Sequence, residues 1–123
     1  MSRNEQVAVV EAFFAAIVSK DLSRLPVDPD LTAESPLTPK LRGRAALEYL
    51  RNVAANVKAI RITRHIVEGD LVATLFEEDT AHGVLPVFAT FQIVAGRIVD
   101  TRALRKGARS VPRRSPERLL AQC

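Results

Sequence analysis

Three consecutive carboxylates, Glu77, Glu78 and Asp79, end an apolar stretch of the chain and are the residues best suited to acid–base chemistry. A carboxyl group beside an apolar pocket loses hydration, which raises its pKa and lets it exchange protons near neutral pH. The alternative is a solvated strand end, because inward-facing carboxylates without partners are rare. Both parities of the stretch are apolar, so the sequence leaves open which carboxylate faces inward.

Several hydrogen-bond donors could assist such a carboxylate. Tyr49 lies one position from the apolar stripe of an expected helix, where it is either a pocket hydroxyl or a core aromatic with a solvated tip. Thr101 and Arg105 share a parity on the last expected strand. Arg105 could hold an anionic group bidentately, or it could be a solvated arginine at a strand end.

The histidines and the cysteine do not form a metal-ligand pattern. His65 and His82 are far apart, with no carboxylate at metal-ligand spacing, and Cys123 is the single cysteine. One cysteine excludes an intramolecular disulfide and a cysteine-based zinc site. We therefore expect neither a metal site nor a cofactor, and we interpret both histidines as structural.

The net charge of +4 belongs to one end of the chain. Residues 102–123 hold seven bases and one acid, which gives +6, whereas residues 1–101 hold eleven bases and thirteen acids, which gives −2. Arginines without interleaved aromatics make a poor platform for single strands, so nucleic acid is not an expected partner. We expect one domain over residues 1–106 and a basic, mobile tail over 107–123.

No segment has the pattern of a membrane span or a secretory signal. The longest uncharged apolar run, residues 12–19, is far too short to cross a bilayer. The first residues lead into an amphipathic pattern and not into the apolar core of a signal peptide. These features predict a cytoplasmic protein with no membrane partner.

Apolar residues recur at helical spacing in two parts of the chain. The spacing predicts one helix over residues 7–19, with Asn4 as its N-cap, and another over residues 44–55. A short helix is expected between them, over residues 21–25, before a turn at 27–30. The chain therefore begins with three expected helices.

Alternating patterns predict five strands, over residues 31–35, 57–67, 71–79, 86–94 and 97–104. Loops are expected at 80–86 and at 35–41, the latter with an edge strand as the alternative. Ile60, Ile62 and Ile66 should share one face of their strand, with His65 on the other. Helices followed by an antiparallel meander make the fold class α+β.

Three stretches, residues 34–44, 76–86 and 96–104, together with the first helix, resemble the nuclear transport factor 2-like superfamily. This superfamily includes ketosteroid isomerases, limonene epoxide hydrolase and SnoaL-like polyketide cyclases. The resemblance implies a cone-shaped, curved antiparallel sheet (a half-barrel) that three N-terminal helices wrap around an apolar pocket. It also implies an apolar small molecule as ligand.

The positions that carry catalysis in the ketosteroid isomerases are altered here. Their base matches Ser35, their oxyanion-stabilising acid matches Ala89, and their tyrosine matches Phe13 or Phe14. None of these residues can replace the original group, since an unactivated serine hydroxyl does not accept a proton near neutral pH. Ordinary ketosteroid isomerisation is therefore not expected.

The catalytic positions of the epoxide hydrolases and of the polyketide cyclases are also poorly matched in this sequence. The arginine of the epoxide hydrolases falls near Phe76, and their two aspartates fall near Glu78 and at Ala103. Lys106 stands about where many of the polyketide cyclases carry an aspartate. The resemblance thus leaves Glu34, Glu77 and Glu78 as acid–base candidates. Glu34, next to Ser35 in an extended segment, could take over the role of the base only through a register shift or a bulge.

The resemblance also suggests which residues touch a ligand and which meet a partner. The last-strand parity of Thr101 and Arg105 should face the pocket. The expected ligand contacts are Phe13, Phe14, Ile17, Phe91, Thr101 and Arg105. Phe88, Thr90, Gln92 and Val94 form a second face that is too apolar for open water, which favours a homodimer through the outer face of the sheet.

Three functions remain open from the sequence. The first is an isomerase, cyclase or dehydratase for an apolar substrate, with Glu34, Glu77 or Glu78 as acid–base and Tyr49 as hydrogen-bond donor. The second is a binding protein with the same pocket and no chemistry, which the altered positions favour. The third is an interaction module that works through the dimer face or the basic tail.

Overall fold

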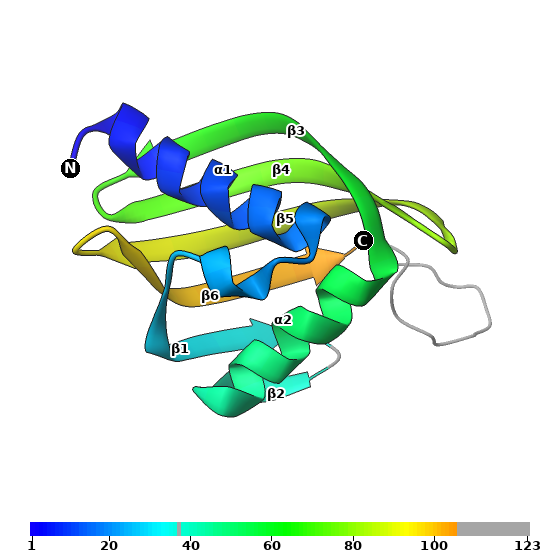
Figure 1. Cartoon of the computed structure of the whole chain (residues 1–123). Helices are drawn as coiled ribbons and strands as arrows, with labels where there is room; N and C mark the ends of the chain where they lie inside the picture. The colour runs from blue at the N-terminus through cyan, green and yellow to red at the C-terminus, as the bar shows by residue number, and fades with distance from the viewer. Residues whose placement is uncertain (37, 106–123) are drawn as a thin grey trace.

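Two α-helices cover one face of a six-stranded sheet (Figure 1). The computed structural model describes residues 1–36 and 38–105, so the expected tail lies outside the described residues. The strand order is β2-β1-β6-β5-β4-β3, and all neighbours run antiparallel except β1 and β6, which are parallel. The α+β class and the curved sheet are confirmed. Only a 3-10 helix, Leu22–Arg24, stands where a third helix was expected.

Helix α1, Arg3–Ser19, begins four residues earlier than its apolar pattern predicts. Ser2, and not Asn4, is the N-cap. Its hydroxyl accepts a hydrogen bond from the Glu5 amide at 3.1 Å, and the Glu5 carboxylate accepts one from the Ser2 amide at 2.8 Å. This capping box satisfies amide groups that the first turn would otherwise leave unpaired, which extends the helix.

Helix α2, Arg44–Asn56, agrees closely with the expected range and buries Ala46, Leu50 and Ala54. Gly43 precedes it with φ of 61°, a backbone conformation that favours glycine. The helix leads directly into the first long strand at Val57. Among the described residues, no helix combines the length and apolar character that crossing a bilayer requires.

Strand β1, Val27–Ser35, extends the expected strand at 31–35 backwards, and β2, Thr38–Arg42, is the edge strand that was one of two alternatives for residues 35–41. The expected turn at 27–30 is part of β1, where Pro29 falls in a stretch with interrupted pairing to β6. The expected loop at 35–41 contains β2, an edge strand, so that Pro39 need not donate a ladder hydrogen bond on its open side.

Strand β3, Val57–Glu68, contains a bulge that the alternation rule could not reveal. Ile62 is paired with Phe76 and Arg64 with Leu75, so residue 63 has no partner and the parity of the strand flips. His65 and Val67 therefore face the helices, whereas Ile66 lies on the outer face. The prediction that Ile66 shares a face with Ile62 was wrong for this reason.

Strands β4, Leu71–Thr80, β5, Gly83–Val94, and β6, Arg97–Arg105, form the centre of the sheet. The expected loop at 80–86 shrinks to a tight turn, because Gly83 pairs with Thr80 and the ladder continues without a break. On β5 the predicted alternation is confirmed: the buried residues are Val87, Ala89, Phe91 and Ile93.

Four phenylalanine rings connect α1 to the sheet. Phe13 and Phe14 of α1 lie 5.3 and 5.7 Å from Phe91, measured between ring centroids, and Phe14 lies 4.6 Å from Phe76. Edge-to-face packing at such distances adds to the stabilisation that comes from burying the rings. The cluster fixes α1 over β4 and β5.

The difference in burial between the two faces of β5 leads to a prediction about stability. Phe91 is 1% exposed and Phe88 is 40% exposed. We expect Phe91→Ala to lower the free energy of unfolding by about 3–5 kcal/mol, because it leaves a cavity in the core. For a single copy of the chain, Phe88→Ala, the matched control, should cost about 1 kcal/mol or less. Urea unfolding of both variants measures this, and equal losses would contradict the assigned faces.

Candidate functional site

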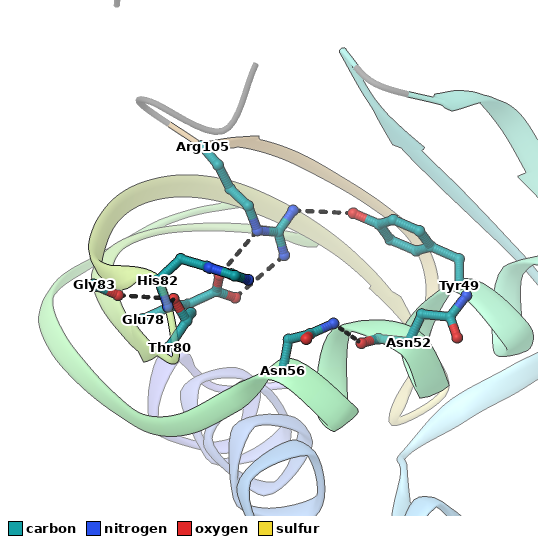
Figure 2. Close-up of polar contacts among 8 residues, drawn as sticks. All are labelled: Tyr49, Asn52, Asn56, Glu78, Thr80, His82, Gly83 and Arg105. Carbon is teal, nitrogen blue, oxygen red and sulfur yellow. Dashed lines mark hydrogen bonds and ion pairs between the residues drawn. The ribbon is translucent and has the colours of Figure 1, made fainter. Parts of the chain in front are cut away.

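A buried polar cluster lies where α2 faces the end of the sheet, and Figure 2 shows its three side chains pointing toward one another. The Arg105 guanidinium donates to both carboxylate oxygens of Glu78, from Nε at 2.9 Å and from Nη2 at 3.2 Å. Its Nη1 donates to the Tyr49 hydroxyl at 3.0 Å. Arg105 therefore joins a carboxylate on one strand to a phenol on a helix.

Strand parity places these groups on the inner face. On β4 the buried residues are Val72, Thr74, Phe76, Glu78 and Thr80, so Glu78 faces inward while Glu77 and Asp79 face outward. Arg105 lies at the end of β6, opposite Val87 of β5. The long arginine side chain crosses the width of β5 to reach Glu78, since neighbouring strands lie about 4.8 Å apart.

The contact with Glu78 favours the charged form of Arg105 inside the protein. Burial alone would lower the pKa of the Arg105 guanidinium, but the hydrogen bonds and charge of Glu78, together with Tyr49, raise this pKa above its ordinary value. The two charges cancel. Three of the five N–H groups of Arg105 are used, and the other two have no partner among the described residues.

A small cavity of ≈ 30 Å³ lies beside this cluster. Its walls come from α1, α2 and the inner face of the sheet, and apart from the polar cluster they are mostly apolar. The structure brings nine of the ten candidate residues to its lining: Phe13, Phe14, Ile17, Glu34, Tyr49, Glu78, Phe91, Thr101 and Arg105.

The three carboxylate candidates lie at different positions relative to the cavity. Glu77 lies on the outer face, 3.4 Å from the Arg61 guanidinium, and so has no access to the cavity. Glu34 lies at the cavity rim, with its half-exposed carboxylate 3.8 Å from Arg102. Glu78 is the carboxylate that is buried at the cavity, and proton transfer by Glu77 in this cavity is ruled out by its position.

Three of the positions at which this chain differs from the resembling enzymes line the cavity. Phe76, Ala89 and Ala103 line it, so no polar side chain from these positions enters the site. The Ser35 hydroxyl lies 3.2 Å from the Thr38 hydroxyl. Lys106, the remaining altered position, lies outside the described residues.

The histidines lie apart from the cavity. The His82 amide donates to the Thr80 hydroxyl at 3.1 Å, in the tight turn between β4 and β5. The His65 ring lies between Thr74, at 2.9 Å, and Glu11, at 3.3 Å, which links α1 to the sheet. Within residues 1–36 and 38–105, no group of three histidine, cysteine or acidic side chains is arranged to hold a metal ion.

The Glu78–Arg105 pairing was not predicted from the sequence. The two residues are 27 positions apart, and each was considered separately as a strand-end charge. A signal existed, because both lie at strand ends and carry opposite charges. Using this signal required knowing which side chains of β4 face inward. The two faces of this strand are equally apolar in the sequence, so the pattern did not reveal it.

The comparisons with known proteins agree on the fold. A family model described as a SnoaL-like domain matches residues 10–101, more than half of the chain. A search of curated proteins gave no match.

Three solved structures illustrate this likeness. A de novo designed protein with a curved β-sheet has a TM-score of 0.77 at 18% identity, over 87% of this chain and 89% of its own. A nuclear transport factor 2-like protein of unknown function from Cytophaga hutchinsonii has a TM-score of 0.69 at 13% identity, over 81% and 88%. An LEH-like epoxide hydrolase of M. tuberculosis has a TM-score of 0.68 at 24% identity, over 83% of each chain. At such identities the likeness shows the fold and not the activity.

The buried ion pair between Glu78 and Arg105 leads to a second prediction about stability. Glu78→Gln leaves the Arg105 guanidinium without its counter-charge, and removing one partner of a buried pair typically costs about 3–5 kcal/mol. We expect a loss of about 3 kcal/mol in the free energy of unfolding. Glu77→Gln removes an exposed pair on the same strand and should cost about 1 kcal/mol or less. Chemical denaturation distinguishes the two, and a tolerant Glu78→Gln variant would show that the pair contributes little.

Proposed function

This chain belongs to the SnoaL-like domain family of the nuclear transport factor 2-like superfamily, and we propose that it acts on an apolar small molecule as an isomerase, cyclase or dehydratase. Glu78 is the proposed acid–base and Tyr49 the proposed hydrogen-bond donor. The observation that carries the proposal is the position of a buried carboxylate and a phenol, joined by Arg105, at one end of an otherwise apolar cavity.

Glu78 suits the transfer of a proton within the cavity. Each of its oxygens accepts one hydrogen bond from Arg105, and a carboxylate oxygen has a second lone pair that can take a proton. The bidentate contact fixes the carboxylate, which lowers the cost of orienting it toward a substrate. Proton transfer by a positioned side chain contributes about 10²–10⁴-fold to a reaction rate.

Tyr49 complements this base. Because its oxygen accepts a hydrogen bond from Arg105, its own hydrogen can be donated to an oxygen of the substrate. In the proposed reaction, Glu78 removes a proton from a carbon next to a carbonyl group, and Tyr49 stabilises the negative charge that forms on the carbonyl oxygen. Glu78 then returns the proton to another carbon in an isomerisation, or to a departing hydroxyl group in a dehydration.

Binding without chemistry is the second candidate. The apolar residues Phe76, Ala89 and Ala103 at the cavity favour it, because related enzymes are expected to carry catalytic groups at these positions. The same pocket and ligand class would serve this function. A comparison of binding with turnover separates the two candidates.

A ligand screen followed by turnover tests the proposed function. Thermal shift against steroids, polyketide-like aromatics, terpenoid epoxides and fatty acids should reveal a class that stabilises the protein, by about 2.7 kcal/mol at one hundred times its dissociation constant. For that class, mass spectrometry should detect a product. Glu78→Gln should lower kcat by about 10²–10⁴-fold while the ligand still binds.

Glu77→Gln is the matched control and should keep full activity. Binding without any product would support a ligand-binding pocket and contradict the proposed enzymatic activity. Equal turnover by Glu78→Gln and the unchanged chain would exclude Glu78 as the acid–base.

We also propose a homodimer through the outer face of the sheet. Leu75, Phe88 and Leu104 are paired side by side on neighbouring strands, and each is 38–58% exposed. A groove elsewhere on the surface is lined by three acids and three bases, so both signs of charge are available there for contacts with a second copy. The charged residues of the groove are Asp28, Asp30, Asp100, Lys40, Arg42 and Arg102.

Light scattering after gel filtration tests the dimer. The unchanged chain should have the mass of two copies, whereas Phe88→Glu or Leu104→Glu should give one copy, because each buries a charge in the apolar row. Ile62→Glu is the control, since Ile62 is 38% exposed but lies on the inner parity of β3. A single-copy mass for the unchanged chain at high concentration would refute the proposed dimer.

A further inference from the structure

The cavity is too small for the ligands that the proposed function requires. Its volume of ≈ 30 Å³ holds about two water molecules, whereas pockets for small molecules typically measure about 300–1,000 Å³. One wall must therefore move before such a ligand can enter. We propose that α2 is a lid over this cavity and that the Tyr49–Arg105 hydrogen bond is its latch; this inference rests on the proposed function.

The other walls are fixed more firmly. The strands that line the cavity are joined by ladders of backbone hydrogen bonds, unbroken between β4 and β5 and interrupted once between β5 and β6, at Gln92 and Ile93. Helix α1 buries six side chains, including Phe13 and Phe14. Gln6 of α1 donates to the Gly69 carbonyl at 2.7 Å, and His65 links Glu11 to the sheet. Moving α1 would break all of these contacts at once.

Helix α2 has a smaller share in the core. It buries only three side chains, two of them alanines. Its ends are held through backbone atoms: the Gly43 amide donates to the Leu31 carbonyl at 2.8 Å, and the Lys20 ammonium donates to the Val57 carbonyl at 2.9 Å. Between these ends, the Tyr49–Arg105 contact is the single side-chain hydrogen bond from α2 to the sheet in the described part of the chain.

This arrangement lets the inner side of α2 turn outward about its two held ends. Figure 2 shows Tyr49 on α2 with its hydroxyl directed at Arg105, so turning the helix outward breaks this hydrogen bond and carries Tyr49 away from the cavity. Arg105 stays in place, because its bidentate contact with Glu78 does not involve the helix. The open state therefore keeps the acid–base and enlarges the space beside it for ligand entry. Closure of α2 over the bound ligand returns the Tyr49 hydroxyl to the substrate oxygen, where the proposed reaction uses it.

The latch also indicates which ligands would open it. When Tyr49 leaves, Arg105 has an additional free N–H directed at the cavity, besides the two without a described partner. A ligand oxygen can accept these hydrogen bonds. Because Glu78 already cancels the charge of Arg105, an uncharged oxygen such as a carbonyl group suits the site better than a carboxylate does.

Hydrogen exchange detected by mass spectrometry tests the latch without any ligand. Tyr49→Phe removes the hydrogen bond and keeps the ring, so the amides of α2 should exchange about tenfold faster while those of α1 and β5 stay unchanged. Glu48→Gln, an exposed change on the same helix, is the control and should change nothing. Unchanged exchange in Tyr49→Phe would refute the latch, and faster exchange throughout the chain would show a merely structural role.

The single tyrosine provides a second measurement. The chain has no tryptophan, so its intrinsic fluorescence near 300 nm comes from Tyr49. Acetylcyclohexane and ethylcyclohexane, each at half of its aqueous solubility, present the same hydrophobic driving force with and without a carbonyl group. The ketone should increase the quenching of Tyr49 by acrylamide and the exchange of α2, and the alkane should not.

An equal effect of both compounds, or an effect of neither, would overturn the role of the ligand oxygen. These measurements do not depend on turnover. A latch that opens in a protein without activity would refute the proposed enzyme alone, and activity with an α2 that never opens would refute the lid alone.

Discussion

The buried ion pair between Glu78 and Arg105 is the interaction on which the site depends. Two charges can be removed from water only when each satisfies the other, and the bidentate contact at 2.9 and 3.2 Å does so. The pair spans β4 to β6 across β5, so it requires the register of both strand pairings to be correct. A slip of one residue in either strand would turn one charge to the outer face and leave the other unpaired. The site and the central sheet therefore specify each other.

The sequence predicts the elements that follow a single periodicity and misses those that depend on a distant partner. The alternation of β5 and the extent of α2 could be read directly, because one face of each is clearly apolar. The bulge in β3 could not, since a skipped residue leaves the composition unchanged and only the pairing with β4 reveals it. The first part of the strand at Val27–Ser35, residues 27–30, was hidden for a related reason: Pro29 suggests a turn unless the partner strand is known.

The same limit applies to the site. Aromatic and apolar lining residues such as Phe13 and Phe91 could be expected from the helix and strand patterns. The choice among Glu77, Glu78 and Asp79 could not be made, because the residues before them alternate between two apolar sets, one of which lies on the exposed outer face. An apolar outer face conceals parity, and it is also what makes a second copy of the chain a plausible cover for that face.

Several positions that are expected to carry catalytic groups in the resembling enzymes hold apolar residues here. The polar side chains that remain at the cavity therefore determine what it can do. Phe76, Ala89 and Ala103 contribute only hydrocarbon to the cavity, so any chemistry or recognition there must use Glu78, Arg105, Tyr49, the hydroxyl of Thr101 or Glu34 at the rim. Arg105 holds both the acid–base candidate and the hydrogen-bond donor, but by contacts of unequal strength. Two charge-assisted bonds tie it to the sheet through Glu78, and one bond ties it to α2 through Tyr49. Because the weaker tie is the one to the helix, the cavity can open without dismantling the charged pair beside it.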